Sequence, residues 1–181
     1  MFHSNTKLLI DYWRERRGER ALPLRSAIDP MDFAALLPQT FVAAREAGGA
    51  YIFRLAGETL ADLHGRGLRG EALTSLWRPA HRVQLVAALD AALRAPSPLV
   101  VHAEGRTDDA TALRLEILFA PLADSVGTAD RFLGHYQPAG PLSHLHGRAF
   151  RELAILDVSG TDERQAAPRL RLAAVDGRQI A

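Results

Sequence analysis

Two strand-like segments that lie far apart in the sequence constrain the fold of this chain most. Residues 50–65 (AYIFRLAGETLADLHG) and 111–122 (TALRLEILFAPL) each alternate apolar with polar or small residues. Such alternation predicts strands with one buried face, and the first segment runs directly into a pattern typical of a short helix. Together they predict a small antiparallel sheet that holds helices against one face. This arrangement favours a sensor or binding module over an enzyme.

Caps, glycines and prolines indicate the other elements. We expect an N-terminal helix from Ser4 or Asn5 to about Gly18, and a short helix between Asp29 and Pro38. The remaining predicted elements are strands over 39–46, 51–56, 99–106, 112–119 and 129–136, and helices over 58–64 and 79–94. Residues 150–158 fit either a strand or a short helix. This order predicts an α+β fold with helices on one face of a five-stranded antiparallel sheet.

Composition narrows the classes of partner. Of the 181 residues, 48% are hydrophobic and the formal net charge is +1, so no strong field selects nucleic acid or an anionic membrane. The absence of cysteine excludes disulfides, thiolate metal sites and cysteine nucleophiles. The N-terminus lacks the apolar core of a signal peptide, and no apolar run approaches the ~20 residues that span a bilayer. We therefore expect a soluble, cytoplasmic protein.

Several stretches carry a resemblance to a known family. They are DYWRERRGERALPLRSAIDP (11–30), LLP (36–38), FRLAGETLADLHGRGLRG (53–70), LRLEILFAPL (113–122) and PRLRLAAVDGR (168–178). In their order and spacing, the chain resembles a bacterial family of stand-alone PAS-type proteins. The resemblance implies a PAS-like core over 38–138, an N-terminal helical extension over 1–37 and a C-terminal extension or tail over 139–181. It does not imply a particular ligand.

PAS domains often hold a small ligand between the sheet and its helices, so the inward positions are candidate ligand-binding residues. These are Phe53, Leu55, Leu63, Trp77, His81, Leu85, Leu115, Ile117 and Phe119. The same positions are also typical of a filled apolar core, which is the rule because protein interiors are close-packed. The sequence leaves open which of the two they form.

The N-terminal helix carries an apolar stripe of Leu8, Leu9, Tyr12 and Trp13. It can pack on the sheet of its own chain or on the same helix of a second subunit. Since PAS domains commonly dimerise through flanking helices, we expect a homodimer with these four residues in its interface.

Cofactor and metal signals are weak. Haem would need an axial histidine in the pocket, such as His64 or His81, and nothing selects between them. A cysteinyl–flavin adduct, as in light-sensing PAS relatives, is excluded because there is no cysteine. His144 and His146 alone do not make a metal site. Gly65, Gly67 and Gly70 match G-x-G-x-x-G but do not join a strand to a long helix, so the dinucleotide interpretation fails.

The leading hypothesis is a PAS-type sensory or signalling module without catalysis of its own. It would bind a small ligand or a protein partner and act through an unidentified signalling protein. One alternative is a small α+β pocket enzyme of the isomerase or hydratase type, which would need a histidine such as His81 or His135 in a wet, open cavity. Another is a structural dimerisation adaptor with a filled core.

Overall fold

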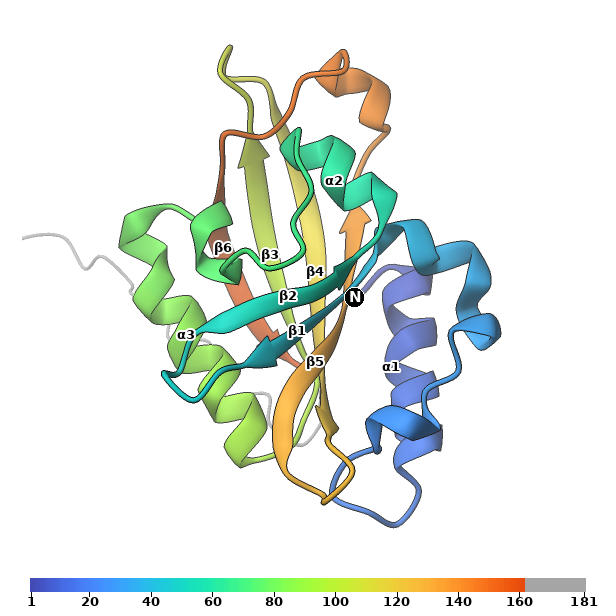
Figure 1. Ribbon diagram of the computed structural model, residues 1–181. Helices are drawn as coiled ribbons and strands as arrows, with labels where there is room; N and C mark the ends of the chain where they lie inside the picture. The colour runs from blue at the N-terminus through green and yellow to red at the C-terminus, as the bar shows by residue number, and fades with distance from the viewer. Residues whose placement is uncertain (162–181) are drawn as a thin grey trace, which may run out of the picture.

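A six-stranded antiparallel sheet forms the centre of the molecule (Figure 1). The computed structural model describes residues 1–161. The strands are β1 (Thr40–Arg45), β2 (Tyr51–Ala56), β3 (Leu99–Arg106), β4 (Ala112–Ala123), β5 (Ala129–Pro138) and β6 (Glu152–Gly160), in the spatial order β2-β1-β5-β4-β3-β6. The α+β class is confirmed, but the sheet has one strand more than expected. The ambiguous segment is the extra strand, because it pairs with β3 from Leu99↔Gly160 to Arg106↔Glu152.

Helical segments cover both faces of this sheet. The α-helices are α1 (Ser4–Arg17), α2 (Glu58–His64) and α3 (Pro79–Arg94), and the 3₁₀ segments are η1 (Arg25–Ala27), η2 (Pro30–Gln39), η3 (Leu73–Leu76) and η4 (Leu142–Leu145). Figure 1 shows α1 and α3 on opposite sides of the sheet. Buried residues of α2, η3 and α3 belong to one core cluster, and those of α1 and η2 belong to the other. The N-terminal extension therefore lies against the sheet face that the other helices leave uncovered.

Capping residues in the sequence predict the starts of the N-terminal helices to within about one residue. His3, rather than Ser4 or Asn5, is the N-cap of α1, and its Nδ1 accepts a hydrogen bond from the Asn5 backbone N–H at 3.2 Å. Asp29 caps η2 as expected, because its carboxylate accepts from the Met31 N–H at 2.9 Å. This segment consists of two 3₁₀ pieces joined by a kink at Phe33, and the second continues through Pro38 to Gln39, so it ends later than the sequence predicts.

Apolar contacts and side-chain hydrogen bonds fix the α1 helix to β4, β5 and η2 of its own chain. The Trp13 indole donates to the Pro121 carbonyl at 2.6 Å, and the Tyr12 hydroxyl donates to Asp32 at 3.0 Å. Leu9, Tyr12 and Trp13 are buried, whereas Leu8 is 49% exposed. Three of the four residues predicted for a dimer interface are therefore buried within their own chain, and only Leu8 is accessible to a second subunit.

A β-bulge in β2 changes the direction of one predicted core residue. Ala43 pairs with Phe53 but Val42 pairs with Leu55, so Arg54 is the extra residue. Because each residue inserted into a strand reverses the alternation, Leu55 leaves the face on which Phe53 lies. Phe53 is buried on the α2–α3 side, and Leu55 is 50% exposed on the α1–η2 side.

Candidate functional site

Aromatic side chains fill the predicted cavity between the sheet and the α2–α3 layer. The ring of Phe41 makes edge-to-face contacts with Phe53, Phe119 and Tyr136, with centroids 5.4–5.8 Å apart. It lies over Gly134 in β5, where a Cβ atom would come within 1.9 Å of the ring. Seven of the nine predicted ligand-binding residues lie in this buried cluster: Phe53, Leu63, Trp77, Leu85, Leu115, Ile117 and Phe119. The structure brings them together as packed core.

The other two predicted ligand-binding residues, Leu55 and His81, do not belong to this cluster. Leu55 faces the opposite side of the sheet because of the bulge at Arg54. His81 lies in the first turn of α3, where its Nδ1 accepts the Ile155 backbone N–H at 2.8 Å. This hydrogen bond joins α3 to β6 and satisfies one backbone N–H of that edge strand.

Two other histidines are buried among packed side chains. The ring of His64 makes edge-to-face contacts with Tyr136 and Phe150, and burial lowers its pKa to about 4. His135 is 0% exposed on the α1 side, and burial likewise lowers its pKa to about 4. Within the described residues, neither ring nitrogen of His135 makes a hydrogen bond of good geometry, although the Gln137 side chain and the Gln39 backbone lie close enough to act on its pKa. Neither histidine lines an open cavity of the kind that the enzyme alternative requires.

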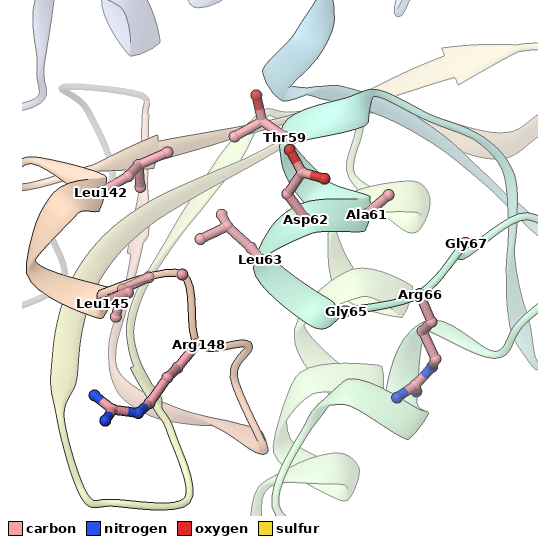
Figure 2. Close-up of a pocket in the computed structure, with 11 residues that line it drawn as sticks. Thr59, Ala61, Asp62, Leu63, Gly65, Arg66, Gly67, Leu142, Leu145 and Arg148 are labelled. Atoms are coloured by element: carbon pink, nitrogen blue, oxygen red, sulfur yellow. The ribbon is translucent and has the colours of Figure 1, made fainter.

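A large hollow lies outside this core, between α2 and the segment that follows β5 (Figure 2). Its volume is about 680 Å³, and it is open to solvent. Its lining residues are Thr59, Ala61, Asp62, Leu63, Gly65, Arg66, Gly67, Leu142, Leu145, Gly147 and Arg148. We call this the α2–η4 groove. Figure 2 shows the Leu63 side chain of α2 directed toward Leu142 and Leu145 on the facing segment.

Backbone contacts hold the two walls of the α2–η4 groove together. The Phe150 N–H donates to the Leu63 carbonyl at 2.7 Å, beside the end of α2. Gly65 ends α2 with a φ of 64°, and a Cβ there would lie 2.9 Å from the Ala149 side chain. Only glycine combines this left-handed conformation with so close an approach at low cost. The groove is therefore a built feature of the fold.

Both arginines at the rim of the groove are already paired. Arg66 makes a bidentate contact with Glu71 at 3.0–3.1 Å, and Arg148 lies 2.8 Å from Asp109. Hydrogen bonds from Thr107 and then Thr111 lower the pKa of Asp109 to about 2, and Arg148 acts in the same direction. The groove therefore carries no strong net field, and its lining combines polar with apolar side chains. Such a surface suits binding, since it offers no shielded nucleophile or acid–base pair.

Sequence reasoning found Leu63 but missed the rest of the groove. Its second wall falls in 139–148, within the predicted extension or tail. The apolar residues Leu142 and Leu145, three apart, were the available signal for a helical turn with a buried side.

Within residues 1–161, no cluster of three or more His, Asp or Glu side chains could hold a metal ion. In the same range, no helix has the length and apolar character needed to cross a membrane.

Comparison with known proteins gives one family match and several distant structural likenesses. The family model described as PAS domain matches residues 1–137. No curated protein matches the chain at the level of sequence.

Among solved structures, the Rhodobacter sphaeroides LOV protein is similar at 16% identity, with 65% of this chain and 72% of that chain covered and a TM-score of 0.47. A PAS domain of a Colwellia psychrerythraea protein gives 13% identity, coverage of 61% and 97%, and a TM-score of 0.45. The VqmA–ligand–DNA complex of Vibrio cholerae is similar at 12% sequence identity, with a TM-score of 0.44. The match covers 60% of this chain and 50% of that chain. These scores are too low for the ligands or partners of those proteins to be transferred to this chain.

Proposed function

The chain belongs to the PAS domain family, and on this premise we propose that it is a sensory or signalling module that receives its effector in the α2–η4 groove. PAS domains are typically signalling modules and are usually non-catalytic. The observation that carries the proposal is the filled interior. Phe41, Phe53, Phe119 and Tyr136 occupy the space between sheet and helices, so the accessible binding volume lies outside it.

The dimensions and lining of the groove support a small effector with an apolar body and polar groups. Pockets for such molecules usually measure ~300–1,000 Å³ and combine apolar walls with a few polar side chains. The groove, at about 680 Å³, is lined by the apolar residues Leu63, Leu142 and Leu145 and by the polar residues Thr59 and Asp62, among others. Because the groove is open to solvent, a segment of a protein partner is the second candidate effector.

A cysteinyl–flavin adduct cannot form on this chain, because it contains no cysteine. The catalytic alternative gains no support from His81 or His135, since one contacts β6 and the other is enclosed. A homodimer stays a prediction; of the four residues proposed for its interface, Leu8 is the accessible one.

Thermal shift of the full chain against a library of small molecules tests the proposal. Two variants accompany it, one at a leucine of the groove and a matched one at an exposed valine of α3. Leu142→Asp places a charge in the groove, and Val83→Asp makes a similar change on α3, where Val83 is 81% exposed. A compound at a hundredfold excess over its Kd stabilises the protein by about 2.7 kcal/mol. We expect this stabilisation to disappear in Leu142→Asp and to persist in Val83→Asp.

Methyl NMR locates the binding site independently of stability. If an added compound changes the methyl chemical shifts of Leu63, Leu142 and Leu145, the result agrees with the proposal. Compounds that shift Leu115 and Ile117 instead, and that still stabilise Leu142→Asp, would place the effector in the interior and overturn it. If no compound binds, photo-crosslinking from position 62 tests the protein-partner form, and a crosslink that Leu142→Asp leaves unchanged would contradict that form as well.

A further inference from the structure

A second, smaller pocket lies on the opposite face of the sheet, between the N-terminal segment and the strands. Its volume is about 230 Å³. It is lined by Arg25, Ile28, Pro30, Phe33, Leu37, Thr40, Val42, Leu55, Leu122 and Leu133. We call it the η2 pocket. It shares no lining residue with the α2–η4 groove.

Two local features build the η2 pocket. The bulge at Arg54 turns Leu55 onto this face of the sheet, where it lies beside Val42. Bulges often re-aim a side chain next to a functional site. On the other wall, Tyr12 accepts the Asp29 N–H at 2.9 Å and donates to Asp32 at 3.0 Å. These bonds from α1 fix the start of η2, which carries Phe33 and Leu37.

The lining of the η2 pocket defines the body of a ligand. Except for Arg25 and Thr40, its lining side chains are apolar, and the Thr40 hydroxyl already donates to the Leu36 carbonyl at 2.7 Å. A cavity of about 150 Å³ lined by Leu, Ile and Phe side chains is enough for benzene. The volume of about 230 Å³ therefore fits one aromatic ring or a short alkyl chain together with a small polar group.

Arg25 defines the polar group. It is the one charged residue of the lining, and it is exposed at the edge of the pocket. Among residues 1–161, no carboxylate lies within ion-pair distance of its guanidinium. This contrasts with Arg66 and Arg148 at the α2–η4 groove, which are both paired. A guanidinium matches the geometry of a carboxylate in two parallel hydrogen bonds.

We propose that the η2 pocket binds a small monocarboxylate with an aryl or short alkyl body, the carboxylate at Arg25 and the body between Phe33, Leu37, Leu122 and Leu133. Such a ligand contacts the N-terminal segment and the sheet at once. Its occupancy therefore strengthens the attachment of that segment to the sheet. The proposal stands whether or not the α2–η4 groove receives an effector.

The test uses benzoate and hexanoate as probes on the full chain, with benzyl alcohol and hexanol as uncharged counterparts. Binding is measured by methyl NMR titration of Leu55, Leu122 and Leu133. We expect saturable shifts with both carboxylates. Arg25→Gln should weaken carboxylate binding about three- to fivefold, as expected for an exposed charge pair, and leave alcohol binding unchanged. Arg20→Gln, at an exposed arginine outside the pocket, is the matched control.

A second pair of variants locates the site. Leu55→Trp fills the η2 pocket, and Leu156→Trp makes the same change on β6 at nearly equal exposure, 50% against 51%. We expect Leu55→Trp alone to abolish binding, with circular dichroism showing that both variants are folded.

Three results would overturn the proposal. The first is no saturable shift with either carboxylate, and the second is equal affinity for carboxylate and alcohol. The third is another occupant, seen as nuclear Overhauser contacts from Leu55 or Leu133 to a second copy of the chain or to residues 162–181.

Discussion

His64 and His135 are buried, neutral imidazoles, one on each side of the sheet. His64 contacts the rings of Tyr136 and Phe150, with Arg66 and Glu71 as its nearest charges. His135 lies beneath α1, with His3 and Glu116 as the charged or titratable groups that affect it. Burial is the largest cause of the lowered pKa in both cases, because it penalises the protonated ring.

These two residues predict how stability depends on pH. The unfolded chain takes up a proton on each histidine near pH 6.5, whereas the folded chain does so only near pH 4. Between these values the unfolded state binds more protons, so the free energy of unfolding falls as pH falls. Each histidine contributes on the order of 3 kcal/mol, present above pH 6.5 and lost by about pH 4. Urea denaturation at a series of pH values measures this loss.

Substituting one histidine separates its contribution from that of the carboxylates. His135→Leu replaces a ring that makes only weak polar contacts, with Gln137 and Gln39, by an apolar side chain, so little stability should be lost at pH 7. In this variant, the free energy of unfolding should fall less steeply between pH 6.5 and pH 4 than in the parent protein. An unchanged slope would contradict the assignment of that slope to His135.

At the scale of single elements, α1 is attached to the sheet by one buried polar contact in particular. The Trp13 indole donates to the carbonyl of Pro121, with both groups beneath the helix. Trp13→Phe retains a ring but leaves that carbonyl without its donor. A buried acceptor left unsatisfied costs about 1–3 kcal/mol, so the variant should lose at least this much stability.

Leu8→Ala is the matched control on the exposed side of the same helix. It should change stability by no more than about 0.5 kcal/mol. Urea denaturation gives both values, and hydrogen exchange across α1 shows whether the helix loosens. Equal losses of unfolding free energy in Trp13→Phe and Leu8→Ala would mean that the Trp13 contact does not hold α1 in place.

Local patterns were sufficient for most elements and failed where a distant partner decides the outcome. The span of α3 follows from its prolines and apolar face, and the sequence predicts it as Pro79–Arg94, as observed. The pattern at 150–158 is ambiguous, because the choice of strand depends on pairing with β3. Leu55 was assigned to the wrong face because strict alternation cannot reveal the bulge at Arg54.

The candidate site was predictable only in part for the same reason. Leu63 lies on a recognisable helix, and its apolar character indicates a buried face. The facing wall of the α2–η4 groove comes from Leu142 and Leu145, about 80 positions later in the numbering. Nothing local pairs these two segments, so the groove is visible only once the sheet is assembled.

At the scale of the whole molecule, one sheet supplies both cores. Neighbouring residues of the same strand face opposite ways: Val100 and Leu133 belong to the α1 side, while Val101 and Phe132 belong to the α3 side. A loss of strand pairing therefore exposes both cores together. The protein should unfold as one cooperative unit, although helices cover it from two sides.

The two tryptophans test this cooperativity, since Trp13 lies in the α1-side core and Trp77 in the α3-side core. Both are about 1% exposed, so each reports loss of packing on its own side. In Trp77→Phe and in Trp13→Phe, one tryptophan remains. Within each variant, the urea midpoint of fluorescence should coincide with that of far-ultraviolet circular dichroism, because strands and both cores are lost together. A fluorescence midpoint below the circular dichroism midpoint in Trp77→Phe alone would mean that α1 leaves the sheet before the remainder unfolds, and would contradict the single-unit prediction.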